Sequence, residues 1–589
     1  MKTTEMYPKE VGRPKGGFDE GKTTERKVRN FVIIVLLAAL AVMMLAACSS
    51  QDRSSGSDYI PIEIFSDDGA IMPYEPSGSD VFIGMEMEQR RQELLELDWD
   101  DEVWDESDNE EYGNLWDEPA DEREPEPAAA QALDPDPFRN EGYIPITDNV
   151  FVNPAEESAV SFTLQIDTAS YRNVARFINS GHRPPPNAVR VAEMINYFNY
   201  DMVLPTNDSP FSIYTEIGPS PFNDDMHLAF IRVRAQDIDR ADLPGSNLTF
   251  LIDTSGSMAP QNRLPLLQQS LALLVENLDE RDTVSVVTYA GCARVLLDSV
   301  PGNRHDYIMD AINGLRASGG TAGGPGIMRA YELANQNFNP DMNNRIILAT
   351  DGDFNIGVSN TDELEVLMAE QNRRGIHMTL LGFGVGNYMD RTMETIARNG
   401  NGAYHYVDNI NVARKIFVEE LVSNMFVIAE EVRAQVVFNP ETVSSYRLIG
   451  YENRIMENRH FDDDSRDAGE VGVGSDLVIM FEIQMSDAVL LRSARQHLFT
   501  VRIRYHEPGA TDSNLIEIPA YSNIPIENSN DFNFAASVAA FGHILRNSEF
   551  SGNATVPHVL SLSNDSIGPD THGHRRGFIE LVEAYQRIR

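Results

Sequence analysis

Residues 248–258 read LTFLIDTSGSM, an apolar strand that runs directly into a series of oxygen-bearing side chains. An extended chain points alternate residues the same way, and Gly256 permits a turn, so the oxygens of Asp253, Ser255 and Ser257 can converge on one point. Hydroxyl-rich ligation by oxygen alone suits Mg²⁺ or Mn²⁺ better than Zn²⁺. The stretch therefore predicts half of a hard-metal site at the end of a strand.

Two later stretches carry the same kinds of side chain. Residues 318–324, SGGTAGG, form a glycine-rich loop that holds the single hydroxyl of Thr321. Residues 345–353, RIILATDGD, are a buried-type strand that ends in the carboxylate of Asp351 and a turn glycine. Both supply oxygen ligands, and we expect them to complete the site begun at Asp253.

Taken together, the three motifs resemble the metal-ion-dependent adhesion site of von Willebrand factor type A domains. Its five ligand positions match Asp253, Ser255, Ser257, Thr321 and Asp351. The resemblance implies that these residues hold Mg²⁺ (or Mn²⁺) and that an Asp or Glu of a protein partner completes the coordination. It therefore implies a metal-dependent protein-binding module.

The periodicity of residues 246–426 predicts an α/β fold, a doubly wound parallel sheet of Rossmann-like type. Short apolar runs cover residues 283–289, 346–349 and 378–383, and segments of helical period cover 264–278, 364–374, 391–398 and 412–425. Ligands of such sheets bind at the carboxyl ends of the strands, where the strand order reverses. If the first and fourth strands are the central pair, as in the family, Asp253 and Asp351 meet there.

Other interpretations of these residues remain open. Asp253 and Asp351 could cap helices while the serines satisfy backbone amides. A Mg²⁺-dependent hydrolase is less well supported, because aspartyl-phosphate phosphatases carry a second acid where this chain has Ser255, and no histidine lies in the crevice segments. We predict no catalytic residue and no enzyme. A structural envelope scaffold with a non-exchanging metal is the alternative function.

The amino-terminal residues 1–47 predict an export signal. Basic residues precede an apolar stretch at 31–47, which closes with Leu45-Ala46-Ala47-Cys48. That tetrapeptide is similar to the lipobox of bacterial lipoproteins, which implies that Cys48 is lipidated. An uncleaved membrane helix is the alternative. Both interpretations place a membrane-anchored chain outside the cytoplasm, at the cell surface or in the periplasm.

Residues 48–140 differ sharply in composition from the rest of the chain. Residues 51–140 contain 28 Asp or Glu and 5 Arg, a net charge of −23 out of −44 for the whole chain. Such a segment repels itself and cannot bury a core, so we predict a disordered acidic tether. A specific acidic docking peptide is the alternative. Nucleic acid is excluded as a partner, because its binding requires a basic surface.

The segments that flank the module predict one partner domain divided in two. Residues 141–245 have an α+β pattern, residues 427–525 a β-sandwich pattern, and residues 526–589 form helices. We expect strands on both sides to pair into a single sandwich with the module inserted in it. These flanks are also similar to those of bacterial lipoproteins that carry a central von Willebrand type A domain. The similar segments are residues 167–171, 183–186, 193–198, 447–454 and 534–542.

Overall fold

The computed structural model describes most of the chain beyond residue 137. The described residues are 64–65, 71–72, 138, 141–165, 167–201, 209–352, 361–385, 388–400, 402–464, 466, 468–490, 495–522 and 527–588. The predicted signal segment, Cys48 and nearly all of the acidic tether lie outside them. Within these ranges, no helix is both long and apolar enough to cross a bilayer.

The chain divides into two compact units, residues 1–135 and 136–589. In the first unit, the described part is a pair of two-residue antiparallel strands, β1 (Ile64–Phe65) and β2 (Ile71–Met72). The second unit contains the predicted module and both of its flanks. The domain boundaries given above remain predictions.

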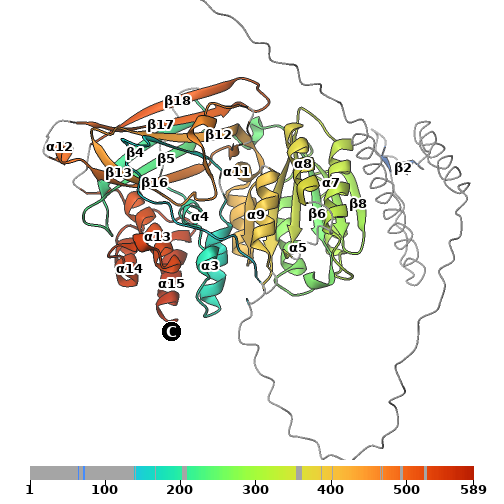
Figure 1. Cartoon of the computed structure of the whole chain (residues 1–589). Coiled ribbons are helices and arrows are strands. Elements are labelled where there is room, and N and C mark those ends of the chain that lie inside the picture. The colour runs from blue at the N-terminus through green and yellow to red at the C-terminus, as the bar shows by residue number, and fades with distance from the viewer. Residues whose placement is uncertain are drawn as a thin grey trace, which may run out of the picture. The chain divides into compact units, whose positions relative to one another are not determined.

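A six-stranded sheet forms the centre of the inserted module (Figure 1). Its strands are β6 (Ser246–Asp253), β7 (Thr283–Tyr289), β8 (Ala293–Pro301), β9 (Asn343–Thr350), β10 (Ile376–Phe383) and β11 (Tyr404–Val407), in the order β11-β10-β9-β6-β7-β8. The predicted central pairing of the first and fourth strands, β6 and β9, is confirmed. One edge strand was not predicted: β8 pairs antiparallel with β7, because the three-residue turn between them is too short for a parallel crossover.

Helices cover both faces of this sheet, and every residue of β6 is buried as a result. They are α5 (Leu264–Val275), α6 (His305–Asn313), α7 (Gly323–Gln336), α8 (Thr361–Arg373), α9 (Asp390–Asn399) and α10 (Ile410–Arg414). Phe250 and Ile252 pack in one core with α5, while Leu251 packs in another with α7. This alternation is what two covered faces require.

The last helix of the module is not the single helix predicted over residues 412–425. The chain instead forms α10, a π-helical turn η4 (Lys415–Glu419) and α11 (Leu421–Met425). β12 begins two residues later, at Val427. The helix is thus interrupted where it approaches the next domain.

The flanking segments build two antiparallel sheets that face each other. One contains β3 (Ala159–Thr163), β12 (Val427–Phe438), β14 (Ile455–Met456), β15 (Gly469–Gly472), β17 (His497–His506) and β18 (Ser513–Tyr521). The other contains β4 (Phe211–Pro219), β5 (His227–Ala235), β13 (Val443–Ile449) and β16 (Asp476–Met485). Each sheet mixes strands from before and after the module. The predicted insertion into a β-sandwich is therefore confirmed.

The entry and exit of the module lie side by side. The backbone N–H of Gly474 donates to the carbonyl of Gln236, on the entering chain, at 2.9 Å. The neighbouring N–H of Val473 donates to the carbonyl of Phe426, on the leaving chain, at 2.8 Å. A domain whose ends meet in this way can be inserted without disturbing the sandwich around it.

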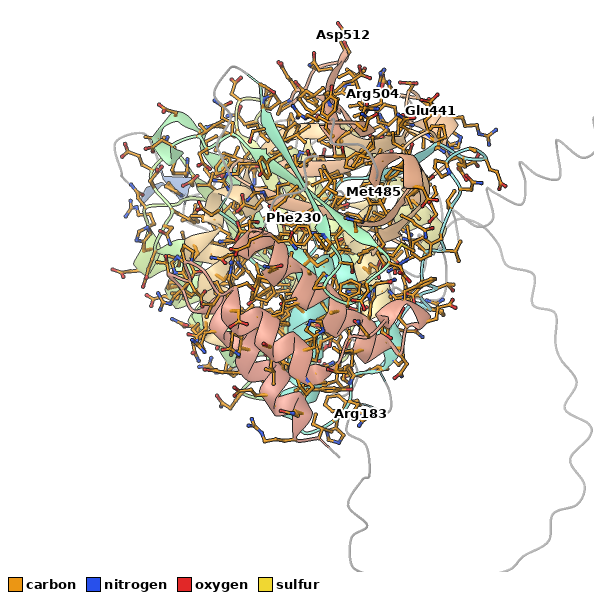
Figure 2. The ribbon with its side chains drawn as sticks, turned by 90° about the vertical axis from the view of Figure 1, so that its left-hand side faces the viewer. Arg183, Phe230, Glu441, Met485, Arg504 and Asp512 are labelled. Atoms are coloured by element: carbon orange, nitrogen blue, oxygen red, sulfur yellow. The ribbon has the colours of Figure 1, made fainter. Side chains whose placement is uncertain are left out.

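Helices cover the outer face of the four-stranded sheet, as Figure 1 shows for α13–α15. They are α3 (Ala169–Asn179), α4 (Val191–Asn196), α13 (Asn530–Arg546), α14 (Val556–Asp565) and α15 (His574–Gln586), with the short α12 (Asp487–Leu490) at the end of β16. On β5, Ala229 and Ile231 enter the sandwich core, whereas Phe230 faces the helices (Figure 2). The ring of Phe230 contacts the ring of Phe532 on α13. A 3₁₀ turn at Pro186–Ala188 directly precedes α4.

A buried ion pair joins the first flank to the module. Arg190, at the start of α4, places its Nη1 atom 2.6 Å from Oδ2 of Asp390, the first residue of α9. The side chains are 5% and 0% exposed, so neither charge is solvated by water. Glu193 and Glu394 also pair with Arg190, which leaves the arginine held among three acids.

Replacing Asp390 by Ala should destabilise the protein by about 3 kcal/mol, because it leaves a buried arginine short of one carboxylate. The measurement is the denaturant midpoint of the full chain. The matched control is Glu332→Ala, which breaks a partly exposed pair with Arg329 and should change stability by less than about 1 kcal/mol. Equal effects of the two substitutions would contradict the assigned role of the buried pair.

Candidate metal centre

Asp253 is the last residue of β6, and its side chain is fully buried. Its Oδ1 atom accepts a hydrogen bond from the backbone N–H of Ser255 at 2.8 Å. Its Oδ2 atom accepts from the hydroxyls of Thr350 at 3.0 Å and Tyr289 at 3.2 Å. Residues at the ends of the adjacent strands β9 and β7 therefore fix the orientation of this carboxylate.

The surroundings of Asp253 disfavour its negative charge. Burial raises the pKa of the Asp253 carboxyl, and the nearby charge of Asp351 raises it further. Hydrogen bonds from Ser255 and Thr350 oppose that rise. A buried carboxylate that stays ionised under these conditions is stabilised by a cation beside it.

The two serines lie together, as their spacing predicts. Ser255 is buried and Ser257 is half-buried, and their Oγ atoms are 2.9 Å apart. They are close because the chain turns through the 3₁₀ segment η3 (Gly256–Met258) directly after the strand. Two hydroxyl oxygens thus lie next to the Asp253 carboxylate.

The glycine-rich loop that carries Thr321 is attached to the ends of β6 and β7 by backbone hydrogen bonds. Ser318 donates to the carbonyl of Thr254 at 2.8 Å, and Gly256 donates to the carbonyl of Gly319 at 3.0 Å. One residue after Thr321, Ala322 donates to the carbonyl of Ala290 at 2.7 Å. Thr321 itself is half-buried. The loop is therefore held on the same edge of the sheet as the serines.

Asp351 directly follows β9 and is also buried. Its Oδ2 atom lies 2.6 Å from Nη1 of Arg263, and the same nitrogen donates to the backbone carbonyl of Ser257 at 2.6 Å. Arg263 therefore connects Asp351 to the serine turn. All five residues predicted from the sequence lie at the carboxyl edge of β6, β7 and β9.

These side chains fit a small hard cation. They offer two carboxylates and three hydroxyls, and Mg²⁺ is bound by such oxygens while it keeps several waters. Among the residues that the structure describes, no group of three or more His, Cys, Asp or Glu side chains could hold a metal ion. A metal at Asp253 and Asp351 would thus depend on the hydroxyls for its remaining protein ligands.

His377 and His574 lie away from this edge. His377 is the second residue of β10, at the amino end of the strand, and its Nδ1 atom lies 2.8 Å from Oε1 of Glu470. It therefore lies at the opposite end of the sheet from Asp253 and Asp351. His574 lies at the start of α15 and contacts Glu419 at 2.8 Å.

Three residues of the site were not predicted. Tyr289 and Thr350 donate to Asp253, and Arg263 pairs with Asp351. Tyr289 and Thr350 end strands that the sequence places next to β6, so the strand order could have identified them. Arg263 has no such signal, since it precedes α5 by one residue and reaches the site only through the turn of the loop.

Family models match most of the second unit. The model described as von Willebrand factor type A domain matches residues 247–437, and one described as von Willebrand factor matches residues 137–229. A third, described as Uncharacterized protein YfbK, C-terminal, matches residues 423–588. Together they cover the inserted module and both flanks.

Individual proteins are also similar to this chain. The Uncharacterized protein YfbK of Escherichia coli (strain K12) is 38% identical over 462 residues, which are 75% of this chain and 80% of the relative. The Uncharacterized protein sll0103 of Synechocystis sp. is 25% identical over 313 residues, 50% of this chain and 70% of its own. The solved structure of a von Willebrand factor type A protein from Catenulispora acidiphila is 16% identical and covers 64% of this chain and 92% of its own, with a TM-score of 0.40.

Replacing Asp253 by Asn should stabilise the metal-free fold by about 1 kcal/mol at neutral pH, because it removes a buried charge whose pKa is raised. A raised carboxyl pKa costs stability above that pKa, so the gain should shrink as the pH falls through it. The measurement is thermal unfolding in EDTA across a pH series. Asp310→Asn, at an exposed position on α6, should change nothing, and a destabilised Asp253→Asn protein would contradict the electrostatic account.

Proposed function

Because the chain belongs to the family of the Escherichia coli protein YfbK, with a von Willebrand factor type A domain and a YfbK carboxyl-terminal domain, we propose that it binds a protein partner through Mg²⁺. Domains of the von Willebrand type A family mediate protein interactions, which supports this general role. The proposed ligands are Asp253, Ser255, Ser257, Thr321 and Asp351.

The observation that carries the proposal is the pair of buried carboxylates at the ends of the central strands. Asp253 and Asp351 end β6 and β9 and lie within range of each other's charge. Ser255 and Ser257 lie beside them, with their hydroxyls 2.9 Å apart. A divalent cation would balance the two negative charges, and the hydroxyls would add neutral oxygens.

Charge also supports a carboxylate-bearing partner. Two carboxylates neutralise Mg²⁺ and three hydroxyls add no charge, so a metal held here stays short of anionic ligands. An Asp or Glu from another protein would exchange for one of its waters. When bound, the metal would supply an electrophilic centre that accepts a carboxylate oxygen of the partner.

The surroundings of the serines favour binding over catalysis. A serine nucleophile needs an adjacent base that takes its proton. The Ser255 hydroxyl instead lies beside the Ser257 hydroxyl and the Asp253 carboxyl, and His377 lies at the other end of its strand. We therefore assign the hydroxyls to metal ligation.

Replacing Asp253 by Ala should abolish Mg²⁺ binding and partner binding together, because it removes a central anionic ligand while the sheet keeps its buried apolar faces. Calorimetry with Mg²⁺ measures the first loss, and circular dichroism checks that the fold is retained. Asp310→Ala is the matched control. Unchanged Mg²⁺ affinity in the Asp253→Ala protein would sink the ligand assignment.

The structural-scaffold alternative makes a different prediction for chelation. A pulldown of envelope proteins with the full chain, with and without EDTA, separates the two. An exchanging adhesion site loses its partner in EDTA and regains it with Mg²⁺. A scaffold with a non-exchanging metal retains its partner under chelation.

We also propose that the chain is a membrane-anchored lipoprotein that acts outside the cytoplasm. The support is the sequence Leu45-Ala46-Ala47-Cys48 at the end of the apolar stretch. With lipid on Cys48, the acidic residues that follow would separate the binding module from the membrane, since like charges extend a chain.

Replacing Cys48 by Ser should prevent lipid attachment and release the protein from the membrane fraction. The readouts are incorporation of labelled palmitate and fractionation of cells that express each variant. Thermal unfolding provides the control, since the variant should retain the thermal transition of the wild type. Full labelling of the Cys48→Ser protein would exclude this attachment site.

A further inference from the structure

We propose that Arg263 provides a fixed positive charge beside the metal site. Its guanidinium shares Asp351 with the divalent ion and thereby sets how tightly that ion is held. The inference rests on the proposed function and concerns a residue outside the five ligand positions. It also bears on the partner, because a fixed positive charge beside the metal favours a carboxylate.

The guanidinium of Arg263 connects three loops that form the edge of the site. It donates to the carbonyl of Ser257 at 2.6 Å, to Oδ2 of Asp351 at 2.6 Å and to the carbonyl of Val385 at 2.8 Å. These acceptors follow β6, β9 and β10. The arginine side chain is 11% exposed, so its charge lies within the site and not on the open surface.

The fold provides a fitted place for this side chain. Gly384 has a φ of +83°, and a Cβ atom added there would lie 2.2 Å from Nε of Arg263. Glycine thus allows both the turn and the passage of the arginine over it. The Oη atom of Tyr406 donates to the carbonyl of Gly384 and supports the turn from the other side. The fold therefore positions the Arg263 side chain.

The charge of Arg263 matters more than its capacity to donate hydrogen bonds. Its Nε atom is buried without an acceptor among the described residues, so the geometry does not satisfy every donor. In the part of the chain that the structure describes, Asp351 is the one acid that forms an ion pair with Arg263. A neutral side chain could donate to the two carbonyls, but only a cation can compensate the negative charge of the buried Asp351 carboxylate.

The consequence for the metal follows from the sum of charges. Asp253 and Asp351 together carry −2, and Arg263 reduces the total to −1. A divalent ion then brings the site to +1. The arginine therefore weakens binding of the metal, and it leaves the loaded site with a positive charge that attracts a partner carboxylate.

The test uses the full chain in detergent and measures Mn²⁺ and Mg²⁺ affinity by calorimetry. Arg263→Gln should bind both ions about tenfold more tightly than the wild type, because it removes a positive charge near the metal. Arg263→Lys keeps the charge and should stay within about threefold of the wild type. The matched control is Arg329→Gln on α7, whose pair with Glu332 is partly exposed and which should bind like the wild type.

A second variant moves the arginine without removing it. Gly384→Ala places a methyl group where Nε of Arg263 lies and should also tighten metal binding, at a cost in stability from the positive φ. This variant decides the question if Arg263→Gln does not fold. A purely structural arginine would instead weaken metal binding in both variants.

Acetate gives an independent readout of the predicted positive charge. Mn²⁺ bound at the site broadens the methyl proton signal of acetate that exchanges on and off the metal. The wild type and Arg263→Lys should bind acetate more tightly than Arg263→Gln. Equal acetate affinity, or metal binding no tighter than the wild type in a folded Arg263→Gln protein, would overturn the inference. Absence of metal binding in the wild type and all variants would instead refute the proposed function itself.

Discussion

The parallel pairing of β6 with β9 is the constraint on which the site depends. Parallel strands that are in register end at the same edge, so the pairing brings Asp253 and the residue after Thr350 to one place. Both carboxylates are then buried, and the charge of Asp351 raises the cost of a charge on Asp253. The hydroxyls, the glycine-rich loop and Arg263 surround these two buried carboxylates.

The same sheet explains how the module combines with its surroundings. Its functional edge is formed by loops that follow the strands, while its entry and exit lie together, joined to Gly474 and Val473 of the sandwich. Buried ion pairs such as Arg190 with Asp390 connect the flank to the module.

Much of this fold could be predicted because the relevant signals are local. Strand β7 has the bounds that its apolar run predicts, since a strand covered on both faces buries consecutive residues. The misses have physical causes as well. The antiparallel edge strand β8 alternates between half-buried and exposed positions over much of its length, and the break at Lys415–Glu419 leaves an apolar pattern that looks like one continuous helix.

The sequence by itself determined which oxygen-bearing side chains follow β6, because residues at alternate positions after a strand form a local pattern that needs no knowledge of distant contacts. It also determined the acidic amino-terminal segment, whose charge is a matter of composition. Only the tertiary structure decided that Tyr289 and Thr350 donate hydrogen bonds to Asp253 and that Arg263 forms an ion pair with Asp351. Those contacts join residues 36, 97 and 88 positions apart, and no local spacing encodes which side chains meet when separate strands and loops pack together.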